Sequence, residues 1–90
     1  SIQSNHLVVY GSLKLTKPLG LGVENSDVSL LQKFLASQGP DIYPSGRVSG
    51  YYGNLTAEAV KRFQVKYGIE ATGTAGPLTR AKINTLLPQE

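Results

Sequence analysis

From Val28 onward, apolar positions recur at the three- and four-residue spacing of amphipathic helices. The first stripe predicts a helix over residues 27–38, and the second predicts a helix over residues 54–67. A third stripe starts at Pro77 and is limited by Pro88. The apolar members of the three stripes are Val28, Leu31, Leu35, Ala59, Val60, Phe63, Tyr67, Leu78, Ile83, Leu86 and Leu87.

Glycine, proline and short polar residues mark the ends of these helices. Gly39 ends the first helix, and Gly68 is a natural residue just beyond the end of the second. Pro77 suits the first turn of the third, where a missing N–H costs nothing. Asn25 or Ser26 can accept a hydrogen bond from a first-turn amide of the first helix. The chain therefore predicts an all-α fold, a compact three-helix bundle.

An internal repeat precedes the second and third helices. Residues 49–56 and 72–79 both read Ser/Thr-Gly-x-x-Gly-x-Leu-Thr, and each copy opens a helix. We expect Gly53 and Gly76 at the helix caps, with the final threonine of each copy bonding back to the cap backbone. The repeat predicts two Gly-rich loop-and-helix units.

Gln32 and Gln64 occupy equivalent places in the first two helices, each beside an aromatic residue of the predicted core. A glutamine in such a position can bond a neighbouring loop backbone or a ligand. We expect the backbone role for both residues.

Two stretches lie outside the helices. Residues 1–18, with apolar segments at 7–10 and 13–15, are expected to form an N-terminal extension, either a short extended segment or a tail. Residues 19–90 would then form the helical domain. The polar loop over residues 39–53 is long for so small a domain, and such loops are usually functional or ordered by their own packing.

Composition narrows the range of functions. Ninety residues, 40% hydrophobic and 17% charged, suit one folded domain rather than a disordered chain. There is no cysteine, and His6 alone cannot build a histidine-based zinc site, so we expect no metal and no cofactor. The six acidic residues include no pair spaced beside a credible nucleophile. We therefore expect no catalytic residues, and the domain is predicted not to be an enzyme.

Charge and hydropathy also bear on partners. The net charge is +3, but the basic residues are scattered, and only Lys61 and Arg62 are adjacent. Without a basic recognition helix, we expect no nucleic-acid binding. No apolar run approaches the roughly 20 residues that span a bilayer, so we expect no membrane insertion. Because methionine is absent, we expect the chain to be processed or to be part of a longer one.

Several motifs together resemble the peptidoglycan-binding domain family over residues 19–87. These motifs are Asp27-Val28, Leu31-Gln32-Lys33-Phe34-Leu35, Gly46-x-Val48-Ser49-Gly50-x-Tyr52-Gly53, Leu55-Thr56-x-x-Ala59-Val60-Lys61-Arg62-Phe63-Gln64 and Gly73-x-x-Gly76-Pro77-x-Thr79. The family is a small three-helix module appended to bacterial cell-wall enzymes. Residues 41–44 make the first loop longer than that of a minimal member.

The resemblance implies a non-catalytic module that holds an attached catalytic or envelope domain on peptidoglycan. It also implies an extracellular or periplasmic location, and we expect a monomer. A different class of function stays open, in which the domain docks on a protein or acts as a prodomain without affinity for glycan. That alternative would be favoured if the apolar residues at 7–10 and 13–15 project from the domain.

Peptidoglycan offers sugar hydroxyls, N-acetyl groups and stem peptides with free carboxylates. A site for it needs aromatic faces, polar partners for amides and hydroxyls, and a cation for a carboxylate. The loop before the second helix supplies all of these within twelve residues. The candidate ligand-binding residues, for glycan or stem peptide, are Asp41, Tyr43, Arg47, Tyr51 and Tyr52.

Each candidate also has a structural alternative. Tyr52, just before a cap glycine, and Tyr43 can pack the loop on the core, and Tyr51 is open between packing and binding. Arg47 can pair with a stem carboxylate or with Asp41 as a staple within the loop. The packing role predicts a buried tyrosine side chain, and the staple predicts an ion pair between Arg47 and Asp41.

Overall fold

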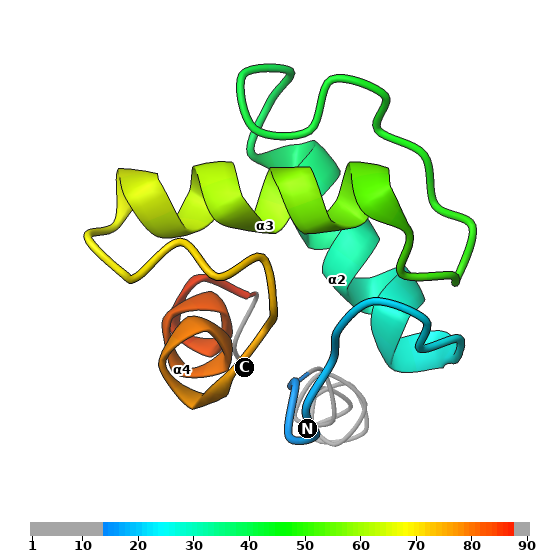
Figure 1. Cartoon of the computed structure of the whole chain (residues 1–90), viewed down its shortest axis with the longest axis horizontal. Helices are drawn as coiled ribbons and strands as arrows, with labels where there is room; N and C mark the ends of the chain where they lie inside the picture. Colours follow the sequence, from blue (N-terminus) through cyan, green and yellow to red (C-terminus); the bar gives the residue numbers. More distant parts are fainter. Residues whose placement is uncertain (1–13, 88–90) are drawn as a thin grey trace, which may run out of the picture.

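In the part of the chain that the structure describes, three helices follow one another (Figure 1). They are α2 over Ser26–Ser37, α3 over Asn54–Lys66 and α4 over Pro77–Leu86. The structure, a computed structural model, describes residues 14–87, in which no strand occurs. The all-α prediction is confirmed, with helix ends that differ from the expected ones by about one residue. The expected apolar segment at 7–10 and the stop at Pro88 lie outside the described residues.

Local chemistry explains where the helices begin and end. Asn25 caps α2, its side-chain oxygen accepting a bond from Val28 N at 3.0 Å. Gly53 and Gly76 are the N-cap residues of α3 and α4, as the repeat predicts. Gly68, with φ +70, follows the end of α3 in a conformation that favours glycine.

The core lies where the helices meet. In Figure 1, α3 runs across the view, α2 crosses behind it, and α4 is seen nearly end-on below it. Phe34 of α2 packs edge to face on Phe63 of α3, with ring centroids 5.4 Å apart. This geometry stabilises the fold by about 0.5–1.5 kcal/mol beyond the contribution of the area that the rings bury. The fully buried core residues on the helices include Val28, Leu31, Leu35, Ala59, Val60, Phe63 and Ile83.

The segment before α2 is joined to the helical domain. Leu15 is buried between the exposed Lys14 and Thr16, as the alternating pattern predicts. Its N–H donates to Asn84 Oδ1 at 2.8 Å, and Asn84 Nδ2 donates back to Leu15 O at 2.9 Å. Leu15 therefore extends the core of the helical domain.

The long loop between α2 and α3 is ordered by its own packing. Ile42 and Tyr43 are buried, and Arg62 Nη1 of α3 donates to Ile42 O at 3.1 Å. The Tyr43 hydroxyl donates to Arg47 O at 2.6 Å, which closes the next part of the loop. These contacts fix a surface loop of the kind that binds ligands on a rigid scaffold.

Gln32 is the polar centre of the first repeat unit and is almost fully buried. Its Nε2 donates to Thr56 Oγ1 at 3.0 Å and to Tyr51 O at 2.8 Å. Its Oε1 accepts from the N–H groups of Ser49 and Gly50, both at 2.9 Å. One side chain of α2 thereby holds the glycine turn and the first turn of α3.

Gln64 does the same for the second unit. Its Nε2 donates to Thr79 Oγ1 at 2.9 Å and to Thr74 O at 3.0 Å, and its Oε1 accepts from Gly73 N at 3.0 Å. The expected backbone role of both glutamines is confirmed. The final threonine of each copy was expected to bond the cap backbone, but its hydroxyl accepts from the buried glutamine instead, because that amide has donors to satisfy.

The turn needs glycine at its second position in both copies. Gly50 has φ +83 and Gly73 has φ +81, a left-handed conformation that costs other residues about 1–2 kcal/mol. A Cβ at these positions would also lie 3.2 Å from Ser29 Oγ and 3.1 Å from Lys61 Cε. The repeated motif is therefore the signature of one backbone shape used twice.

We expect Gln64→Met to lower the free energy of unfolding by about 2–4 kcal/mol, because the buried Gly73 N–H and Thr79 hydroxyl would lose their partner. Urea unfolding followed by circular dichroism measures the change. The matched control is Gln38→Met, at the half-buried end of α2, where we expect a change within about 0.5 kcal/mol. Equal effects of the two substitutions would contradict the role assigned to Gln64.

Candidate functional site

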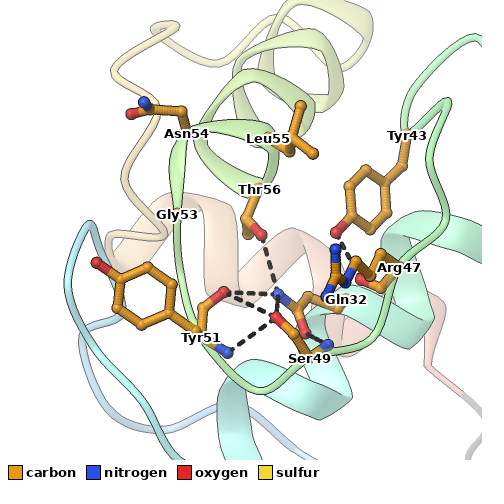
Figure 2. A pocket seen from close by; sticks show the side chains of 9 residues that line it. All are labelled: Gln32, Tyr43, Arg47, Ser49, Tyr51, Gly53, Asn54, Leu55 and Thr56. Carbon is orange, nitrogen blue, oxygen red and sulfur yellow. Dashed lines mark hydrogen bonds between the residues drawn. The ribbon is translucent and has the colours of Figure 1, made fainter.

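A cavity of about 400 Å³ lies between the long loop and the start of α3 (Figure 2). Gln32 stands within it, and its hydrogen bonds hold the surrounding backbone in place. The residues lining the cavity are Gln32, Tyr43, Arg47, Ser49, Tyr51, Gly53, Asn54, Leu55 and Thr56.

Tyr43 and Arg47 form one wall of the cavity. The Tyr43 ring is buried, and its hydroxyl donates to the Arg47 carbonyl, so the packing role of Tyr43 is confirmed, while its ring still lines the cavity. Arg47 is exposed, and within residues 14–87 its guanidinium has neither a hydrogen bond nor an ion pair. The cavity therefore has a cation at its edge that is free to meet an anion.

Apolar surface is exposed on the other side of the cavity. Tyr51 is 49% exposed, and its ring packs against Gly53, where an added Cβ would lie 3.3 Å from Tyr51 Cε2. Leu55, in the first turn of α3, is 60% exposed. Figure 2 shows the Tyr51 ring and Leu55 on opposite sides of Gly53 and Thr56. The cavity thus combines a cation with exposed apolar faces.

The start of α3 adds to the positive character of this site. No side chain caps the helix, because the N-cap residue is Gly53. The first-turn amides of Asn54 and Leu55 therefore have no capping side chain. They lie at the end of α3 that borders the cavity, where the helix dipole is positive. Together with the Arg47 guanidinium, they make this end of the helix suited to a negatively charged group.

Two of the predicted site residues lie elsewhere. Asp41 is exposed in a different hollow, beside Lys61 and Arg62. The ion pair that the described residues form is Lys61–Glu58, at 3.7 Å, so Arg47 is not stapled by Asp41.

Tyr52 is fully buried, and its hydroxyl donates to Gly73 O at 2.6 Å. It joins the first repeat unit to the second, which corrects its assignment as a ligand contact: a side chain without exposed surface cannot touch a ligand. The packing alternative for Tyr52 holds.

The structure adds Leu55, Asn54 and Ser49 to the site, none of which was a candidate. All three belong to the repeated motif, which we interpreted only as a helix start. Leu55 could have been identified from its position, because the motif places this apolar residue in the first turn of a helix. An apolar residue in the first turn of a helix faces solvent unless something covers it.

A family model for peptidoglycan-binding domains matches residues 24–83. The chain belongs to the peptidoglycan-binding domain family. Its resemblance to that family is thereby confirmed, and the match covers α2, α3 and most of α4.

Two related proteins are N-acetylmuramoyl-L-alanine amidases by name. The N-acetylmuramoyl-L-alanine amidase CwlL of Bacillus licheniformis is 39% identical in an alignment of 82 residues that covers 86% of this chain and 21% of CwlL. A "Probable N-acetylmuramoyl-L-alanine amidase" of the same species is 58% identical over 40 residues, 44% of this chain and 11% of that protein. This chain thus spans about a fifth or less of these relatives.

A solved structure has the same fold. The crystal structure of the SleB N-terminal domain superposes with a TM-score of 0.73 at 29% sequence identity, covering 83% of this chain and 99% of that one. None of the helices in the described part of this peptidoglycan-binding domain combines the length and the hydropathy of a membrane span.

Burial raises the pKa of the Tyr52 phenol well above its ordinary value of about 10. Above that pH the native state keeps a proton that the unfolded state loses, so the free energy of unfolding falls as the pH rises past about 10. We expect Tyr52→Phe to lose this alkaline decline. It should also lower stability at neutral pH by about 1–2 kcal/mol, because Gly73 O loses its donor.

Urea unfolding between about pH 8 and pH 11 measures both effects. Tyr51→Phe, at a half-exposed tyrosine, is the control and should keep the decline of the parent. An unchanged decline in Tyr52→Phe would show that this phenol is not its source.

Proposed function

We propose that this domain binds peptidoglycan through the cavity at the start of α3 and anchors an attached domain to the bacterial envelope without catalysing a reaction. One observation carries the proposal. In a chain of this family, a preformed cavity presents an unpaired arginine beside exposed aromatic and aliphatic faces.

Arg47 is the residue that would recognise charge. A guanidinium makes paired, charge-assisted hydrogen bonds to a carboxylate, and stem peptides end in carboxylates. The uncapped first turn of α3 lies on the same cavity and supports a negative group there. We therefore assign the cavity to the stem peptide rather than to the sugar.

Tyr51 and Leu55 would supply contact area. Their exposed apolar faces suit the methyl and methylene groups of stem-peptide residues, or the C–H face of an adjoining sugar. A site of this size suggests an affinity in the micromolar to millimolar range, about −4 to −8 kcal/mol, which a longer parent protein would raise by multivalency.

The wider context supports an anchoring role. The relatives CwlL and the second Bacillus amidase are several times longer than this chain, so a domain of this type occurs beside other segments. Both relatives are named as N-acetylmuramoyl-L-alanine amidases, and we propose an extracellular or periplasmic location here. Among residues 14–87, no cluster of metal-ligating side chains occurs.

The test is retention on purified, insoluble peptidoglycan at low and at high salt. We expect Arg47→Ala to weaken retention about 10- to 100-fold, since charge-assisted bonds contribute about 1.5–3 kcal/mol. Tyr51→Ala should weaken it about 3- to 10-fold, because it removes an aromatic contact worth about 0.5–1.5 kcal/mol. Retention by the parent should outlast salt that would abolish a purely ionic contact.

Matched controls keep the result specific. Lys33→Ala removes an exposed positive charge from α2, and Leu21→Ala removes an exposed apolar side chain, both away from the cavity. Both should be retained as the parent is. If the folded parent is not retained at all, peptidoglycan binding is wrong for this domain, and docking on a protein partner becomes the better assignment.

A further inference from the structure

We propose that a second cavity, at the start of α4, binds an N-acetylated sugar of the same polymer, so that the two repeat units divide the ligand between them. This inference rests on the proposed function and names the part of the polymer that the second unit takes. It starts from a cavity of about 310 Å³ between the 69–74 segment and the first turn of α4.

The second cavity is built like the first. Gln64 bonds the turn and Thr79 in the same pattern in which Gln32 bonds the turn and Thr56. Leu78 is 74% exposed at the rim, as Leu55 is at the rim of the first cavity. The repeat therefore reproduces a cavity together with its supporting frame. This frame consists of the buried glutamine, the glycine turn and the threonine that the glutamine bonds.

The charge at the edge of the second cavity is opposite to the charge at the edge of the first. Glu70 follows Arg47 at the spacing of the repeat, and each lines the cavity of its own unit. Glu70 is exposed and forms no ion pair within the described chain. A carboxylate repels the anionic stem peptide, but it accepts hydrogen bonds from sugar hydroxyls. The second cavity thus selects a neutral ligand rich in donors.

The walls suit an acetyl group. Ile69, Pro77 and Leu78 line the second cavity; at the spacing of the repeat, Pro77 takes the place of Asn54 in the first cavity, and Leu78 corresponds to Leu55. These apolar side chains can cover the methyl of an N-acetyl group and the C–H face of the ring. An N-acetylated sugar offers both these apolar surfaces and the hydroxyls that Glu70 would accept from.

The spacing allows both cavities to work on one polymer. Thr56 of the first frame and Gln64 of the second lie eight residues apart on α3, a rise of about 12 Å. Glycan and stem peptide are covalently joined in peptidoglycan. Two weak contacts with joined groups then act at a high effective concentration.

The experiment is an NMR titration of the whole chain with the neutral β-1,4-linked trimer of N-acetylglucosamine. We expect the amide signals of Thr74, Gly76 and Leu78 to shift. Leu78→Ala and Glu70→Ala should each raise Kd about 3- to 10-fold. The controls Leu21→Ala and Glu58→Ala, at exposed sites outside both cavities, should bind as the parent does.

The proposal is overturned if the trimer shifts no signals at this cavity, or if Leu78→Ala and Glu70→Ala bind it like the parent. Titration with the anionic dipeptide L-Ala-γ-D-Glu separates the two proposals. It should shift Ser49, Tyr51 and Leu55 in the parent but not in Arg47→Ala. Loss of the dipeptide shifts alone would refute the assignment of the first cavity, and loss of the trimer shifts alone would refute that of the second.

Discussion

A buried glutamine amide is the interaction on which the rest of this small domain depends. Gln32 and Gln64 each satisfy a glycine turn through the oxygen, and a carbonyl and a threonine hydroxyl through the nitrogen. Without this amide the turn would bury polar groups that no helix or sheet pairs. Because every buried side-chain polar atom in the described residues has a partner, the turns stay ordered with no regular structure of their own.

The same arrangement of glutamine, turn and threonine explains how so small a domain can hold open cavities on its surface. The turn places the first residues of the next helix against the glutamine, which leaves Leu55 and Leu78 outside the core. The frame fixes the backbone, and the residues around it are free to differ. Arg47 and Glu70 illustrate this, since the same construction carries opposite charges. The two cavities would then bind different parts of the ligand because the residues at their edges differ, while the packing beneath them is the same.

Much of this could be predicted from sequence because it depends on local signals. Helical spacing, the cap at Asn25 and the glycine at position 68 placed the helices to about one residue. The glutamines were predictable in role, since their equivalent positions pointed to loop bonds. The role of Tyr52 was less predictable, because the partner of its hydroxyl, the Gly73 carbonyl, lies 21 residues away in the sequence. Asp41 and Arg47 are six residues apart and still diverge, since the burial of Ile42 and Tyr43 between them turns the loop.

Hydrogen exchange at the Gly50 and Gly73 amides measures whether the buried glutamines hold the two turns in place. Both amides lie in surface turns, and each donates to the oxygen of a buried glutamine. If the glutamine frame holds the turns, the two amides should exchange as slowly as the core amides of α3, through opening of the whole domain. Exchange at the rate of an exposed loop would show that the turns open on their own, and would contradict the account.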